Sequence, residues 1–330
     1  MPEARVDRVE YHLVQRYVGR WGDRGWWRPV VGAVSLVALF YVIGPVLVQI
    51  PFLAGYALSG ADVEEAGRRL VDLDHVTPMS LAYLNLALSV AIPAALVLTR
   101  VLHGVSTGWV TSVVGRLRWR WMAVTFGLAF LALLSTLFVG ALMPSAGEAV
   151  DSSGGLNNWT STTRDFVLVI LFLTPLQAAG EEFAFRGYLT QAFGGIFAPL
   201  GPRVARAAAV LAPATLFAIA HGSQDAPTFV ARLAFGLVAG ILVIETGGLE
   251  AGIAMHVLNN FLAYGFALAF SDMTSAINPT DGSWWSLPTV LTQSLVYLAL
   301  AIWAARRMGV SNVVERSEVP NVLEDPERRV

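Results

Sequence analysis

The chain has 330 residues, of which 55% are hydrophobic and only 14% are charged, and its net charge is -2. Soluble domains carry about 25% charged residues, so this composition indicates a membrane protein. The chain has no cysteine, which excludes disulfides, thiolate nucleophiles and zinc sites with cysteine ligands. All 22 basic residues are arginine and none of them forms a nucleic-acid-binding patch. A cysteine-free, all-arginine chain is typical of a bacterial source.

Eight apolar segments approach or reach the length that crosses a membrane as a helix, because about 20 apolar residues span the roughly 30 Å of hydrocarbon. We therefore predict an all-α fold, a polytopic membrane helical bundle of about eight transmembrane helices. The fourth segment is unusual because it contains charged residues, and the fifth because it is short. The predicted segments are residues 30–56, 77–99, 121–143, 165–193, 206–221, 227–246, 249–270 and 284–303.

The arginines predict the orientation of these helices. Cytoplasmic loops of multi-pass proteins carry an excess of basic residues. Eight alternating crossings with both ends inside place every arginine in the cytoplasm except Arg68, Arg69, Arg164 and Arg232. We therefore predict a multi-pass cell-membrane protein with cytoplasmic N- and C-termini and an uncleaved first helix.

Composition divides the chain into five parts. Residues 1–29 form a cytoplasmic N-terminal segment, and residues 30–163 hold the first three transmembrane helices. In that second part we also expect an interfacial helix at 103–120 and a polar external loop at 144–163. Residues 164–270 carry the polar membrane residues and form the expected core of the site. A C-terminal transmembrane helix at 271–305 and a cytoplasmic tail at 306–330 complete the chain.

The fourth predicted helix carries two adjacent glutamates. Glu182 and Arg186 are four residues apart, so they share a helix face and can pair. Glu181 is turned about 100° away from Glu182 on an α-helix and is available for another role. A structural ion pair between helices is the alternative, although ionisable residues inside a bilayer usually indicate function.

The fifth and seventh predicted helices carry the remaining polar residues. His221 ends the fifth, and His256 lies one helical turn before Asn260 in the seventh. Singly, each is typical of hydrogen bonding between helices. Together with Glu181 they suit hydrolysis, because glutamate and histidine can take a proton from water, and histidine with asparagine can stabilise an oxyanion. Alternatively, Glu181, His221 and His256 could hold a divalent metal such as zinc.

Three short motifs carry a family resemblance. EEFAFRG at 181–187, FAIAH at 217–221 and HVLNN at 256–260 follow the pattern EExxxR, FxxxH and HxxxN, in order and on separate predicted helices. This trio resembles the CAAX-protease and bacteriocin-processing (CPBP) family of intramembrane proteases, which includes type II CAAX prenyl endopeptidases. The resemblance spans about residues 164 to 265, and Phe217 fits the pattern as a supporting residue.

The resemblance implies a helical-bundle peptidase in which Glu181 and His221 activate water. It further implies that His256 and Asn260 stabilise the oxyanion and that Arg186 orients Glu182. Members are often described as intramembrane metalloproteases, and a metal is left open here. Prenyl specificity is not carried over to this chain, because bacterial relatives act on varied peptides.

These observations favour an intramembrane endopeptidase whose partners are the lipid bilayer and a membrane-associated peptide or protein substrate, with no nucleic acid. Two rival hypotheses stay open. In the first, the chain is a non-catalytic scaffold or a bacteriocin-immunity-type protein, and its polar cluster only joins helices. In the second, a proton-coupled transporter uses the cluster as a relay, which would favour inverted repeats that the sequence does not display.

Overall fold

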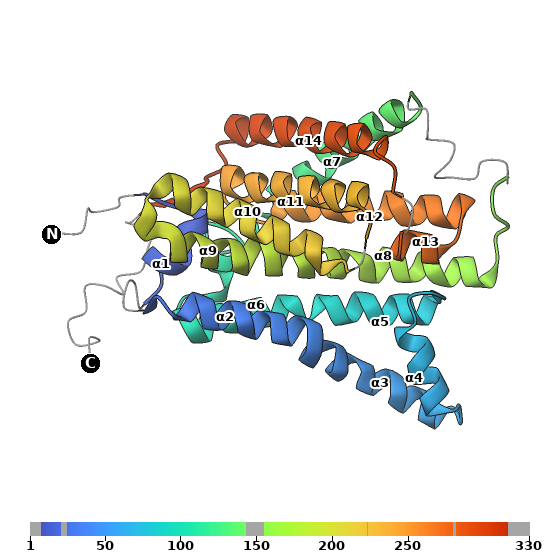
Figure 1. Ribbon diagram of the computed structural model, residues 1–330. Helices are drawn as coiled ribbons and strands as arrows, with labels where there is room; N and C mark the ends of the chain where they lie inside the picture. Colours follow the sequence, from blue (N-terminus) through green and yellow to red (C-terminus); the bar gives the residue numbers. More distant parts are fainter. Residues whose placement is uncertain (1–7, 21–24, 143–154, 223, 280–281, 316–330) are drawn as a thin grey trace.

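The computed structural model describes residues 8–20, 25–142, 155–222, 224–279 and 282–315, and within these it is almost entirely helical (Figure 1). Eight of the described helices are long and apolar enough to cross a membrane. The predicted all-α membrane bundle is therefore confirmed. These helices are Arg28–Leu58, Pro78–His103, Trp119–Gly140, Ser161–Leu200, Pro202–Ala220, Ala226–Thr246, Glu250–Phe270 and Ser286–Met308.

The first two membrane helices are interrupted, whereas the third is continuous. The first contains a π-helical turn, and the second contains a break at Val90. A short amphipathic helix, α4, joins them. Their bounds are α2 (Arg28–Ala38), η3 (Leu39–Ile43), α3 (Gly44–Leu58), α4 (Val63–Val71), α5 (Pro78–Ser89), α6 (Ala91–His103) and α7 (Trp119–Gly140).

The fourth membrane helix is 40 residues long. At about 1.5 Å per residue it measures roughly 60 Å, about twice the hydrocarbon thickness, so its ends extend past the apolar layer. Its middle changes from α to π geometry, and π turns inside α-helices are frequent at functional sites. Its parts are α8 (Ser161–Glu181), η5 (Glu182–Leu189), α9 (Thr190–Phe197) and η6 (Ala198–Leu200).

The second half of the bundle surrounds this helix. Helix α12 packs against both α7 and α8, α10 packs against α9 and α11, and α14 packs against α7 and α11. The turn between α10 and α11 lies well short of the far ends of α8 and α12 (Figure 1). The bounds are α10 (Pro202–Ala220), α11 (Ala226–Thr246), α12 (Glu250–Phe270), α13 (Met273–Ile277) and α14 (Ser286–Met308).

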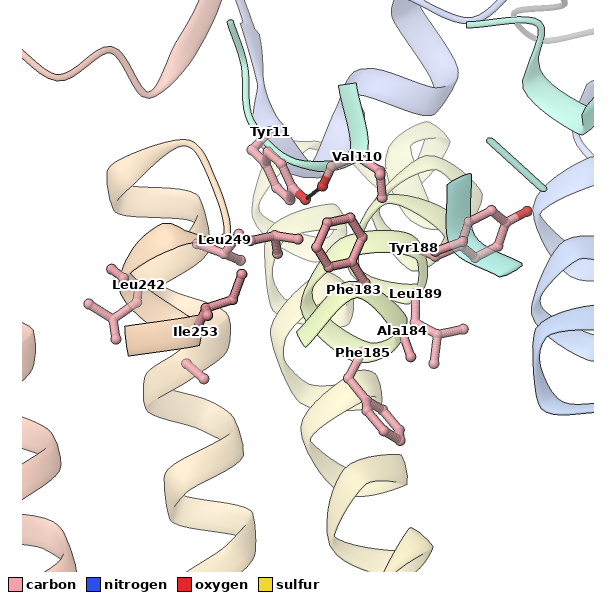
Figure 2. Packing of buried hydrophobic residues seen from close by; sticks show 14 of the residues in the cluster. Tyr11, Val110, Phe183, Ala184, Phe185, Tyr188, Leu189, Leu242, Leu249 and Ile253 are labelled. Carbon is pink, nitrogen blue, oxygen red and sulfur yellow. Dashed lines mark hydrogen bonds between the residues drawn. The ribbon is translucent and has the colours of Figure 1, made fainter. Parts of the chain in front are cut away.

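The two ends of the described chain meet at one end of the bundle (Figure 1). Strand β1 (Arg8–Glu10) pairs antiparallel with β2 (Val313–Glu315). The turns η1 (Tyr11–Leu13) and α1 (Val14–Tyr17) follow β1, and the Tyr11 hydroxyl donates to the Val110 carbonyl. Figure 2 shows this bond beside Phe183 of η5. The segment predicted only as a cytoplasmic N-terminus thus packs against the central π segment.

The predicted interfacial helix at 103–120 is wrong. Only a short 3-10 turn, η4 (Thr107–Val110), forms there before α7 begins at Trp119, and Val110 and Val113 are fully buried. Gly104 and Gly115 adopt positive φ values of 68° and 71°, a conformation that ends a helix and that glycine adopts without strain. Val110 and Val113 therefore pack into the bundle, whereas Val114 and Trp119 of the same segment are exposed.

A buried ion pair fixes the same segment to α12. The Arg118 backbone and Nε both donate to Glu250 Oε1, at 2.8 and 2.9 Å, and Arg118 Nη2 lies 2.7 Å from Glu250 Oε2. Arg118 Nη1 also donates to the Ser311 carbonyl. Glu250 is fully buried, so this network links the loop, the start of α12 and the segment before β2.

Two further predicted segments lie partly outside the described residues. The external loop at 144–163 is described only from residue 155, where Asn157 Nδ2 donates to the carbonyls of Leu268 and Ser271. The tail predicted from residue 306 begins with the last turn of α14 and then forms β2. Residues 316–330 lie outside the described part.

Gly180, beside the polar cluster, allows α8 to lie directly on the α5–α6 junction. A Cβ at this position would lie 2.5 Å from the Leu88 carbonyl oxygen and 3.0 Å from Ser89 Cα. These are backbone atoms that cannot rotate away, so Gly180→Ala should lower the free energy of unfolding by about 1–3 kcal/mol. Unfolding in detergent measures this. The control is Gly127→Ala in α7, where a Cβ meets nothing within 4 Å; equal unfolding midpoints for the two variants would contradict the prediction.

Candidate active site

Polar residues of two membrane helices, the fourth and the seventh, lie together in the bundle. Glu181 ends α8, Glu182 and Arg186 lie in η5, and His256 lies in α12. All four are buried, with exposed fractions of 7%, 0%, 1% and 4%. Ionisable side chains inside a bilayer are costly, which makes such a cluster a functional candidate.

His256 lies between the two glutamates. Its Nδ1 is 3.0 Å from Glu182 Oε1, and its Nε2 is 3.4 Å from Glu181 Oε2. Although the sequence predicts that Glu181 points about 100° away from Glu182, both carboxylates reach the same imidazole through different nitrogens. Gly252, one turn before His256, makes room for this, since a Cβ there would lie 2.5 Å from Glu182 Oε2.

Arg186 lies next to Glu182 and so extends the group of charged side chains around His256. Its Nη1 lies 3.2 Å from Glu182 Oε1, which confirms the ion pair predicted from their spacing. The guanidinium also lies over the ring of Phe217, 4.2 Å from its centre, and 5.8 Å from the ring centre of Phe235. Because the aromatic rings and Glu182 both favour the charged guanidinium, Arg186 holds Glu182 against His256.

Phe217 links the two histidines. Its ring centre is 4.7 Å from that of His221 and 5.9 Å from that of His256, in edge-on contacts. It also packs edge-on against Phe185 and is stacked on Phe235. The supporting residue predicted from the FxxxH pattern therefore fixes both imidazole rings and the arginine, and Phe235 is a partner that the sequence did not reveal.

His221 lies at the exposed C-terminal end of α10. Its Nδ1 is 2.8 Å from the Phe217 carbonyl oxygen, which can only accept, so Nδ1 carries the proton and Nε2 is the basic nitrogen. Within the described residues His221 forms no ion pair with Glu181, although the Glu181 charge acts on it. The histidine in direct contact with Glu181 is thus His256, not the His221 that the resemblance implies as its partner.

Asn260 lies one turn beyond His256 and is held by a residue that sequence reasoning missed. Its Nδ2 donates to Oε1 of the buried Gln177 at 3.0 Å. Gln177 lies four residues before Glu181 on α8, and this spacing places the two on one helix face. An amide in an apolar run, one turn from a candidate base, is the signal that could have identified it.

Three more side chains that the sequence did not select interact electrostatically with Glu181. They are Tyr41 of η3, Arg232 of α11 and Tyr264 of α12. Tyr264 extends the line of His256 and Asn260 by another turn of α12. Glu181 Oε2 is itself buried and has no hydrogen-bond partner in the described part of the chain. This oxygen is the one that lies 3.4 Å from His256 Nε2.

A metal site is not supported by the arrangement of these residues. Among the described residues, no three histidine, aspartate or glutamate side chains are grouped so that they could hold a metal ion. The trio of Glu181, His221 and His256, which the sequence offered as possible ligands, therefore does not form such a group. The chemistry proposed below uses only the side chains of this chain.

The fold and the site together define the class of protein. It is a multi-pass membrane protein in which two glutamates, a histidine and an asparagine lie inside a helical bundle. Residues 163–262 match the family model described as type II CAAX prenyl endopeptidase Rce1-like. This match confirms the resemblance carried by the three motifs, all of which lie inside it. It covers the segment from the start of α8 to the middle of α12.

The comparisons with other proteins and with solved structures add little to the family match. The uncharacterized protein YyaK of Bacillus subtilis (strain 168) is 23% identical over 201 residues, which are 57% of this chain. The aligned part spans 63% of the length of that relative. No solved structure matches the chain.

Proposed function

We propose that this protein is an intramembrane endopeptidase that hydrolyses a peptide bond of a membrane-associated protein or peptide. The family match over the polar core supports a protease of the CAAX type. One observation carries the finer proposal: the carboxylate of Glu181, a residue that is 7% exposed, lies 3.4 Å from His256 Nε2. Such a carboxylate is placed to take a proton from water.

In the proposed reaction Glu181 acts as the general base. It accepts a proton from a water molecule whose oxygen attacks the carbonyl carbon of the substrate, and it returns that proton to the departing amine nitrogen. The basic Nε2 of His221 is a second acceptor for the water. Burial keeps bulk water away from these groups and strengthens their electrostatic interactions.

The oxyanion that forms in this step needs hydrogen-bond donors. We assign this role to His256 and to the Asn260 amide, which has a second N–H besides the one donated to Gln177. Glu182 and Arg186 position His256 through the 3.0 Å and 3.2 Å contacts between them. Gln177 positions Asn260 in the same way.

The orientation in the membrane is part of the proposal. An even number of candidate crossings and the pairing of β1 with β2 support a topology in which both described chain ends lie on one side. The distribution of arginine supports the cytoplasm as that side. The α10–α11 turn, where His221 lies, then faces the opposite side.

The test is cleavage of membrane-anchored peptides of randomised sequence by the purified protein in liposomes, with and without a metal chelator. We expect cleavage by the wild type and none by Glu181→Gln. Cleavage that persists with the chelator indicates water held by protein side chains, whereas cleavage that the chelator abolishes indicates water held by a metal. Intact peptides after incubation with folded wild-type protein would reject the proposal; retained partner binding would then favour a scaffold, and proton flux across the liposomes a transporter.

A further inference from the structure

Arg232 is a cation inside a membrane helix that the proposed chemistry does not use. It lies in the second turn of α11, within the membrane-crossing segment, and its side chain is partly buried. The sequence predicts it as one of four external arginines, because strict alternation of the crossings assigns the start of the predicted segment 227–246 to the outside. An arginine below the membrane surface is costly and usually has a specific partner.

The partners of Arg232 in the described structure do not neutralise it. Its Nη1 donates to Gln224 Oε1 at 2.7 Å, and this amide is neutral. Gln224 is held in turn, because its Nε2 donates to the Ala218 carbonyl at 2.6 Å. Among the described residues Arg232 forms no ion pair within 4.0 Å. The guanidinium is therefore oriented by a fixed neutral group, with further N–H donors available.

The two carboxylates whose charges act on Arg232 both have other partners. The charges of Glu181 and Asp225 act on Arg232. Phe235, three residues further along α11, packs edge-on against His256 with 5.3 Å between the ring centres, so this face of α11 lies against the site. Asp225 accepts from the Thr228 backbone at 2.8 Å and from the Gly282 backbone. The hydrogen bond from Thr228 holds the pKa of Asp225 below its ordinary value, so its charge is committed to capping α11. Glu181 contacts His256 instead.

We propose that Arg232 binds a carboxylate of the substrate peptide close to the bond that Glu181 hydrolyses. The inference rests on the proposed function and adds a substrate class to it. A guanidinium recognises a carboxylate through paired hydrogen bonds, and a pre-oriented one loses little entropy on binding. Arg232 and Phe235 share a face of α11, and Phe235 packs against His256. An anion bound to Arg232 therefore lies on the side of the proposed site, which favours a peptide ligand over a lipid phosphate.

The test measures peptide binding to a form that does not hydrolyse its ligand, Glu181→Gln, in nanodiscs of neutral lipid. The probe is a palmitoylated apolar peptide in three forms: a free C-terminal carboxylate, a C-terminal amide, and the amide with one internal glutamate. We expect one or both charged forms to bind about 10- to 100-fold more tightly than the neutral amide. Comparing the two charged forms shows whether Arg232 binds a C-terminal carboxylate or a side-chain carboxylate.

Adding Arg232→Gln should remove this preference, and Arg232→Lys should restore part of it. The matched control is Arg164→Gln, which removes an exposed arginine paired with Asp165 near the start of α8. Equal binding of charged and neutral peptides before Arg232 is changed would overturn the inference. An equal loss for all three forms after the change would also overturn it, because a structural role predicts that result. Competition by phosphatidic acid nanodiscs against every peptide form alike would assign the arginine to lipid.

Failure of this inference is distinguishable from failure of the proposed function. Peptide binding in the Glu181→Gln background needs no hydrolysis, so a charge preference without wild-type cleavage would reject the peptidase and leave the carboxylate site. Wild-type cleavage without any charge preference would reject the carboxylate site alone.

Discussion

Glu181→Gln should reduce kcat for peptide cleavage by about 10²- to 10⁴-fold with little change in KM. Glutamine keeps the shape of the side chain but cannot take a proton from water, and positioned general bases contribute about this much to rate. The measurement is cleavage of a membrane-anchored peptide in liposomes, together with the unfolding midpoint of each variant in detergent.

The control for this substitution is Glu245→Gln. Glu245 lies in α11 and pairs with Arg206, outside the polar cluster, so the change removes the same charge from the same bundle. We expect nearly wild-type activity. If Glu181→Gln remains as active as Glu245→Gln while folded, Glu181 is not the base.

Arg186→Met should lower the free energy of unfolding by about 3–5 kcal/mol. The change leaves Glu182 fully buried without its cation, and removing one partner of a buried ion pair costs about this much. Loss of the contact with the Phe217 ring adds to the effect. Denaturant unfolding in mixed micelles measures the difference.

The double variant Glu182→Gln, Arg186→Met identifies the cause. Removing both charges eliminates the unpaired carboxylate, so we expect the double variant to be more stable than Arg186→Met alone. Arg164→Met, at an exposed pair, should change stability by less than about 0.5 kcal/mol. A double variant at least as unstable as the sum of its single changes would show that the side chains act independently.

The membrane helices and the polar cluster could be predicted from the sequence because both depend on local patterns. Apolar runs of sufficient length define the helices, and a spacing of four residues pairs Glu182 with Arg186. Family motifs led to the same segment. The predicted fourth helix, 165–193, was too short at both ends. It stopped before Gly194 and Gly195, which the structure keeps within α9, and it began after Ser161.

Contacts between helices could not be predicted in the same way. Which histidine touches Glu181 depends on how α8, α10 and α12 pack, and the room for Glu182 beside His256 depends on Gly252. Neither follows from spacing along one helix. The bond from Asn260 to Gln177 joins residues 83 positions apart. Arg232 was counted as external although it falls within the predicted segment 227–246, because alternation of crossings fixes only which side a residue is nearest, not whether it faces the bundle.

The pairing of β1 with β2 has a consequence for synthesis. The first strand is made before any membrane helix, whereas its partner follows the last one. Until α14 has been inserted, the peptide groups of β1 have no strand to bond, and Tyr11 must reach Val110 without that support. The bundle is therefore completed only after α14 has been inserted, and a ribosome stalled before α14 would leave β1 without its partner strand.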